Sequence, residues 1–158
     1  MSYIQQNLNK IKSQLPSNVT LVAVSKTKPV EDLMEAYNAG QRIFGENKIQ
    51  EMTEKWQQMP KDIEWHMIGH VQSNKVKYMV PYVKLIHGVD SLKLLKEINR
   101  QAARWRKNIN CLLQIHIAEE ETKFGLDENE LIELLNSDEF KEMNNIKVIG
   151  LMGMATFT

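Results

Sequence analysis

A lysine that closely follows an apolar stretch is the side chain with the clearest chemical potential in this sequence. Residues 19–24 are β-branched or apolar at nearly every position, a pattern typical of a strand buried on both faces, and Lys26 comes two residues later. On such a strand, Lys26 would share a face with Val22 and Val24, whose apolar side chains would disfavour a charged ammonium. A neutral lysine amine can attack an aldehyde to form a Schiff base. The alternative is an ordinary lysine whose ammonium reaches water beyond the strand.

Polar residues, glycines and two methionines lie where the other apolar stretches of the sequence end. They are Glu46, Asn47, Gly69, His70, Gln72, Asp90 and His116, and then Met152, Gly153 and Met154. Taken alone, Asn47 is an ordinary helix cap, and a methionine such as Met152 usually fills a core. We expect no metal site, because His66 and His70 on one strand would lie about 13 Å apart and no H-E-x-x-H motif is present. A hydrolase triad has no better support, since Ser25 lacks the glycines of a nucleophile elbow.

Strand-like and helix-like segments alternate along the chain that carries these residues. Strands are expected at residues 19–24, 42–46, 64–69, 84–89, 109–117 and 147–154. Helices are expected at residues 1–15, 29–39, 49–59, 73–79, 92–105 and 128–135, the second of them opened by Pro29 and stopped by Gly40. Strands that alternate with helices through short connections predict a parallel sheet with right-handed crossovers.

The turn after the first strand decides between two kinds of parallel sheet. An open nucleotide-binding sheet usually carries a glycine-rich phosphate loop there, and neither G-x-G-x-x-G nor G-x-x-x-x-G-K occurs in the sequence. This favours an α/β fold of the (β/α)8 TIM-barrel type, in which the chemistry lies at the carboxyl ends of the strands. Six units in 158 residues imply roughly 210 residues for eight. We therefore expect one domain, residues 1–158, with about six of eight βα units, an extra N-terminal helix and an incomplete C-terminal end.

Charge and composition exclude several classes of partner. Twenty basic residues balance twenty acidic ones, so the formal net charge of zero gives no electrostatic reason to expect a nucleic-acid or membrane partner. No apolar run reaches the length that spans a bilayer. The single cysteine, Cys111, excludes an internal disulfide and indicates a cytoplasmic protein.

Four motifs together closely resemble the pyridoxal phosphate homeostasis proteins, the YggS/PROSC family. They are LVAVSKTKP at residues 21–29, FGENKIQE at 44–51, WHMIGHVQSNK at 65–75 and GLMGM at 150–154. The resemblance covers the whole chain and implies the barrel of the alanine racemase N-terminal domain, with pyridoxal 5'-phosphate (PLP) as cofactor. It implies that Lys26 is the Schiff-base lysine, that Asn47 lines the cofactor site and that Met152 lies close to the cofactor. It gives no role to the motif residues His70, Gln72, Asn74 and Lys75.

The resemblance stops short at the C-terminal end. The family continues with a Ser-x-Gly-Met-Ser-x-Asp segment and an Arg-x-Gly segment, which hold the phosphate and face the pyridine nitrogen, and neither occurs in this sequence. This agrees with the count of six units made without the family. An incomplete barrel would leave its last strand as an open edge, and such an edge predicts self-association.

By resemblance, the chain is a non-catalytic cytoplasmic protein that holds PLP on Lys26 for PLP homeostasis and supplies apo PLP-dependent enzymes. The alternative is a PLP-dependent amino-acid racemase, which needs an acid/base on each face of the substrate α-carbon. Lys26 could supply one, and the related racemases take the second from a tyrosine brought by an additional β domain. A third hypothesis, a barrel without a cofactor whose lysine is structural, stays open if the resemblance misleads.

Overall fold

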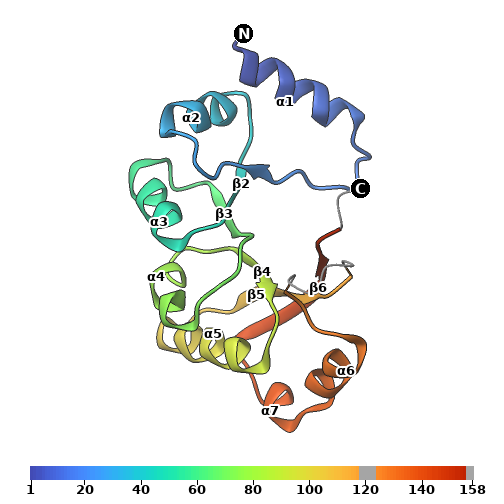
Figure 1. The fold of residues 1–158 in the computed structure, drawn as a ribbon. Helices are drawn as coiled ribbons and strands as arrows, with labels where there is room; N and C mark the ends of the chain where they lie inside the picture. The colour runs from blue at the N-terminus through green and yellow to red at the C-terminus, as the bar shows by residue number, and fades with distance from the viewer. Residues whose placement is uncertain (118–123, 156–158) are drawn as a thin grey trace.

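The computed structural model describes residues 1–117 and 124–155, in which strands and helices alternate (Figure 1). The strands are β1 (Ala23–Val24), β2 (Ile43–Glu46), β3 (Glu64–Met67), β4 (Leu85–Val89), β5 (Ile109–Ile115) and β6 (Ile146–Gly153). The helices are α1 (Tyr3–Gln14), α2 (Val30–Asn38), α3 (Ile49–Gln58), α4 (Val76–Met79) with the 3-10 turn η1 (Ser73–Lys75) before it, α5 (Leu92–Arg104), α6 (Glu128–Asn136) and α7 (Asp138–Lys141). The predicted alternation is confirmed. None of these helices is long and apolar enough to cross a bilayer.

The six strands form one parallel sheet in the order β1-β2-β3-β4-β5-β6. Each strand lies beside its neighbour in the chain, so the winding never reverses as it does in a doubly wound sheet. In Figure 1 the strands line the inner side of an arc and the helices its outer side. This confirms the barrel-type fold with six strands. Within the described residues, β1 and β6 each pair with one strand, so the arc stays open between them.

Local sequence signals explain where the helices begin. Ser2 and Gln5 form a capping box at the start of α1, and Asp127 and Glu130 form another at the start of α6. Ser91 accepts a hydrogen bond from the third residue of α5. These side chains satisfy amide groups that a helix start leaves without partners. Helix starts were therefore predictable to within about two residues.

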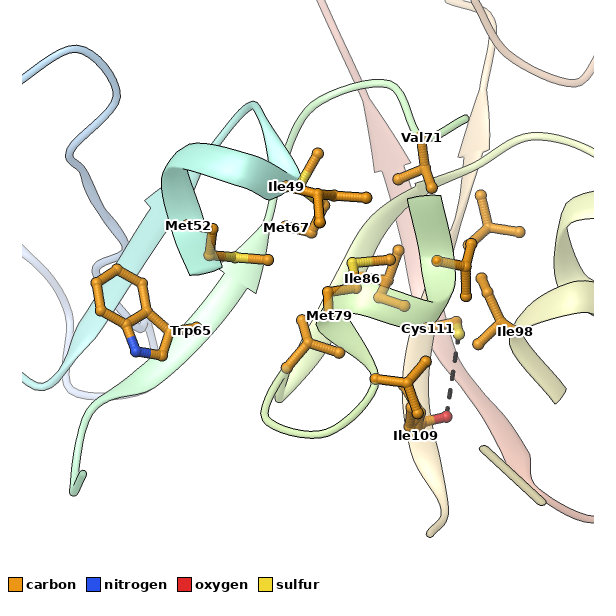
Figure 2. Close-up of a cluster of buried hydrophobic side chains, with 14 of the residues drawn as sticks. Ile49, Met52, Trp65, Met67, Val71, Met79, Ile86, Ile98, Ile109 and Cys111 are labelled. Carbon is orange, nitrogen blue, oxygen red and sulfur yellow. Dashed lines mark hydrogen bonds between the residues drawn. The ribbon is translucent and has the colours of Figure 1, made fainter. Parts of the chain in front are cut away.

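The hydrophobic core fills the layer between the sheet and the outer helices. Figure 2 shows Ile49 and Met52 of α3 facing Trp65 and Met67 of β3, and all four side chains are buried. The same layer continues with Met79, Ile86, Ile98 and Cys111. Burying one such side chain contributes about 1.5–3 kcal/mol. Burial also raises the pKa of the Cys111 thiol to about 12, which makes it unreactive.

The first strand differs most from its prediction. Residues 19–24 were expected to form a strand buried on both faces, yet β1 contains two residues and Val24 is 56% exposed. Because β1 lies at an edge, only one neighbour can form a backbone ladder with it. Leu21 is held instead by a side chain, since Gln41 Nε2 donates to its carbonyl oxygen at 3.0 Å.

Candidate functional site

Lys26 lies in the turn that follows β1, at the carboxyl edge of the sheet, and its side chain is exposed. The expected desolvation of Lys26 by Val22 and Val24 is wrong, because β1 is an edge strand and Val24 itself faces solvent. The backbone around Lys26 is well fixed. Ser25 is buried, and its amide donates to the Gly45 carbonyl at 3.0 Å, which continues the pairing of β1 with β2.

A buried ammonium lies directly beneath this turn. Lys55 of α3 is 6% exposed, and its Nζ donates to Glu46 Oε2 at 2.9 Å and to Glu51 Oε2 at 2.7 Å. The same Nζ donates to the Ser25 carbonyl oxygen at 2.8 Å. A charge removed from water is tolerated when it is paired and hydrogen-bonded in this way. Lys55 therefore joins α3, the end of β2 and the turn after β1.

The two carboxylates complete this cluster, which we call the turn network and define as Ser25, Glu46, Glu51, Lys55 and the Thr27 amide. The Ser25 hydroxyl donates to Glu46 Oε2, and the Thr27 amide donates to Glu51 Oε2 at 2.7 Å. Complete burial raises the pKa of Glu46, and hydrogen bonds from Ser25 and Lys55 only partly oppose this. Burial acts in the same direction on Glu51, but hydrogen bonds from Lys55 and Thr27 outweigh it and lower the pKa of Glu51.

Sequence reasoning missed Lys55, the central residue of the turn network. A usable signal was present, because Lys55 follows Glu51 by four residues and the two therefore share a helix face. Glu46 at the end of a buried strand was a second signal, since a charge in an apolar run needs a partner. Which cation would reach Glu46 could be seen only in three dimensions.

The ends of β2, β3 and β4 approach one another at glycine positions. A Cβ on Gly69 would lie 2.6 Å from the Asn47 carbonyl oxygen, and a Cβ on Gly88 would lie 2.8 Å from the Gly69 carbonyl oxygen. Backbone therefore packs on backbone and fixes Asn47 at the end of β2. Asn47 does not cap α3: the N-cap residue is Lys48, and no side-chain hydrogen bond caps this helix.

Asn47 and part of the third motif line one cavity of about 650 Å³ between α3 and α4. The residues of the third motif in its wall are Met67, His70, Gln72 and Lys75. The structure thus brings Asn47 together with these residues, which the sequence left without a role. Lys26 lies outside this lining, and so does Met152.

Met152 lies on β6, at the opposite edge of the sheet from Lys26. It is half-buried, and its register partner on β5 is Gln114. His70 at the end of β3 is exposed, with its ring stacked on Phe124 at a centroid distance of 3.9 Å. Asn74 is exposed within η1. The candidate residues therefore lie along the whole carboxyl edge of the open sheet.

Two histidines form a pair on the other face of the sheet from the helices. His66 alternates with Trp65 and Met67, which face α3, so its ring points to the inner side of the arc. His66 Nδ1 lies 3.0 Å from His87 Nε2. Burial lowers the pKa of both rings, that of His66 to about 4. Across the described ranges, no group of three or more His, Cys, Asp or Glu side chains is placed to hold a metal ion.

The arrangement at the carboxyl edge fits a ligand that carries an aldehyde. Lys26 offers an exposed primary amine on a turn that the turn network holds in place. Gly69 and Gly88 let the backbones of neighbouring strand ends pack directly on one another, which holds this edge of the sheet in place.

Comparison with known proteins identifies relatives over the whole chain. Residues 1–157 match the family described as alanine racemase, N-terminal domain. The pyridoxal phosphate homeostasis protein of Pasteurella multocida is 39% identical over 160 residues, which cover 98% of this chain and 66% of that protein. Its counterpart in Vibrio alginolyticus is 38% identical over 169 residues, which cover 98% of this chain and 72% of the relative. The chain spans about two thirds of the length of these curated relatives.

Solved structures give the same result for the fold. The structure of PipY from Synechococcus elongatus PCC7942 with PLP bound matches with a TM-score of 0.86 at 35% identity, over 98% of this chain and 72% of that chain. Alanine racemase from Clostridium difficile 630 matches with a TM-score of 0.77 at 18% identity, over 95% of this chain and 39% of that chain. At that identity the likeness concerns the fold alone.

Proposed function

Because the chain belongs to the alanine racemase N-terminal domain family, among the pyridoxal phosphate homeostasis proteins, we propose that it is a non-catalytic PLP carrier. The observation that carries the proposal is the exposed amine of Lys26 on a turn held by hydrogen bonds on both sides. In this proposal residues 1–158 act as one PLP-binding domain that keeps the concentration of free cofactor low. PLP itself supplies an aldehyde, which a lysine amine can hold covalently and reversibly.

Three residues are assigned to the cofactor in this proposal. Lys26 supplies the amine for covalent attachment, Asn47 lines the cofactor site and Met152 lies near the ring. The fixed backbone of Asn47 beside Gly69 supports its role, because a rigid strand end can orient a ligand with little loss of conformational entropy.

A reductive labelling experiment tests the assignment. The purified chain is incubated with PLP, reduced with borohydride, digested and analysed by mass spectrometry. We expect one tag, on Lys26, and we expect Lys26→Ala to abolish it. Lys28→Ala serves as the matched control, since Lys28 is an exposed lysine in the same turn. A tag mainly on Lys28 or Lys75 would refute the assignment of Lys26.

A racemase is the alternative that this proposal rejects. Racemisation needs an acid/base on each face of the α-carbon, and Lys26 is the one candidate assigned to that role. The relatives with the higher identity are homeostasis proteins, whereas the racemase likeness at 18% identity concerns the fold. The test is α-proton exchange of alanine in deuterated water with PLP bound. We expect no stereochemical inversion, and inversion at an enzyme-like turnover would overturn the carrier proposal.

The proposed partners are apo PLP-dependent enzymes in the cytoplasm. An exposed Lys26 leaves an attached cofactor accessible to a recipient, and the free, buried Cys111 suits a reducing compartment. Transfer is measured as recovery of activity by an apo-enzyme mixed with the PLP-loaded chain. Lys26→Ala leaves its PLP free in solution, so release before capture would make recovery slower with the parent chain, whereas direct transfer makes it faster. We expect the faster recovery of direct transfer, and equal or slower recovery would refute direct delivery by this chain.

A further inference from the structure

We propose that the turn network is a positioning device for Lys26, and that Lys55 and Glu51 determine how well this lysine captures an aldehyde. The proposal rests on the function proposed above, because holding the Lys26 backbone in place affects cofactor binding only if Lys26 captures the cofactor. It starts from one geometric observation. The turn network binds both peptide groups that flank the Lys26 Cα atom.

The first of these peptide groups joins Ser25 to Lys26. Its carbonyl oxygen accepts a hydrogen bond of 2.8 Å from Lys55 Nζ. The second joins Lys26 to Thr27, and its amide donates a hydrogen bond of 2.7 Å to Glu51 Oε2. Because Lys55 and Glu51 are themselves joined at 2.7 Å, the two anchors behave as one unit. The backbone of Lys26 is therefore fixed on both sides while its side chain stays exposed.

The conformation of Thr27 shows that the turn needs such an anchor. Its φ of 65° lies in the left-handed region, which a β-branched residue rarely adopts. A backbone of this kind persists only where the surrounding structure determines it. The hydrogen bond from the Thr27 amide to Glu51 supplies this constraint at the strained residue itself.

Burial stiffens the half of the anchor that Lys55 forms with the Ser25 carbonyl, whereas the hydrogen bond from the Thr27 amide to Glu51 is exposed. Lys55 and Glu46 are buried, so water cannot readily replace either partner, and hydrogen bonds between charged groups are stronger in such surroundings. The backbone that carries the Lys26 amine is therefore already ordered before a ligand binds. Preorganisation of this kind strengthens binding because less conformational entropy is lost when the ligand is captured.

The first test compares two substitutions on α3. Glu51→Ala removes the acceptor of the Thr27 amide. Glu54→Ala removes a carboxylate from the same helix that, among the described residues, accepts a hydrogen bond from Gln50 Nε2 at 3.4 Å. Amide hydrogen exchange at Thr27 is measured without cofactor. We expect Glu51→Ala to accelerate it by about tenfold or more, and Glu54→Ala to leave it unchanged. Unchanged exchange in Glu51→Ala would overturn the anchoring step.

The second measurement connects the anchor with Lys26. The dissociation constant of PLP is determined by absorbance for both variants and the parent chain. We expect Glu51→Ala to raise it by about tenfold and Glu54→Ala to leave it within about twofold. Faster exchange at Thr27 with an unchanged dissociation constant would refute the positioning role. If the parent chain itself carried no PLP on Lys26, the proposed function would fail, and the exchange result would still decide whether the anchor exists.

A third variant addresses Lys55 itself. Lys55→Met alone would leave Glu46 as an unpaired buried charge, so the double variant Glu46→Gln with Lys55→Met removes both charges together. Ile98→Ala, in the core of α5, provides a variant destabilised far from the turn. We expect the double variant to weaken PLP binding by about tenfold and Ile98→Ala to leave it within about twofold. Equal losses in both would show a general effect of stability and would refute the proposal.

Discussion

The buried pair of His66 and His87 makes the free energy of unfolding depend on pH below neutrality. Burial lowers the pKa of His66 to about 4, whereas a histidine in the unfolded chain titrates near 6.5. Between these values the unfolded chain binds a proton that the folded chain does not. The free energy of unfolding therefore falls as the pH drops from 6.5 towards 4, by at most about 3 kcal/mol for His66.

This pH dependence is checked by urea unfolding at pH 8 and pH 5. We expect His66→Gln to lose less stability between these pH values than the parent chain, because glutamine does not titrate. His70→Gln is the control, since His70 is exposed at the end of the same strand region. The same loss of stability in the parent chain and His66→Gln would contradict the assignment.

The sequence predicted the positions of Lys26 and Asn47 just after two strands, and the structure places them there. Their roles at a cofactor come from the family resemblance and stay proposals. The exposure of Lys26 could not be predicted, because it depends on whether the first strand has a neighbour on both sides. The link from Lys55 to Ser25 also escaped prediction, since it joins residues of different elements.

At the scale of elements, glycine contacts determine how closely β2, β3 and β4 approach at their ends. Gly69→Ala would place a Cβ 2.6 Å from the Asn47 carbonyl oxygen, so backbone must shift. We expect a loss of about 1–3 kcal/mol in the free energy of unfolding and weaker PLP binding, because Asn47 moves.

Gly150→Ala is the matched control for this substitution. Gly150 lies within β6, and the atom nearest to an added Cβ would be Leu112 Cδ2 at 3.4 Å, an ordinary contact. We expect its free energy of unfolding to stay within about 0.5 kcal/mol of the parent chain in urea titrations. Equal losses in the free energy of unfolding for Gly69→Ala and Gly150→Ala would show that the close contact between Gly69 and Asn47 does not determine stability.

Six helical segments and the central strands were predicted to within a few residues, because caps and apolar runs are local properties. The short helix α7 was not predicted. The length of the first strand was not predicted either, because pairing decides it. Residues 19–22 have strand-like composition, yet they remain outside β1, and the Leu21 carbonyl oxygen accepts a hydrogen bond from the Gln41 side chain instead of from a strand backbone.

At the scale of the whole molecule, the sheet of the 158-residue chain has two edges. Leu151 on β6 is 53% exposed, and Val24 on β1 faces solvent as well. Unpaired strand edges with apolar side chains are templates for pairing with another chain. We expect self-association that increases with concentration in sedimentation velocity experiments.

Two substitutions locate the surface responsible. Ile149→Lys changes β6, whereas Ile132→Lys changes α6 at a residue with the same exposed fraction of 49%. We expect Ile149→Lys to reduce association and Ile132→Lys to leave it unchanged. A parent chain that stays monomeric at every concentration would contradict the open-edge topology.

The barrel type was predictable because strands alternate with helices and no glycine-rich phosphate loop follows the first strand. The curvature of the sheet was not, since it arises from the packing of all strands against their helices. The sequential strand order confirms the predicted barrel type over a doubly wound sheet.

That sequential order has a consequence for synthesis on the ribosome. Every strand after β1 pairs with the strand made just before it, as Phe44 does with Ala23 and Ile146 with Ile109. The entropy cost of closing a loop grows with its length, so pairing with the preceding strand costs less than pairing with a more distant one. Each new βα unit can dock on an edge that already exists, so the nascent chain can acquire its sheet strand by strand from the N-terminus.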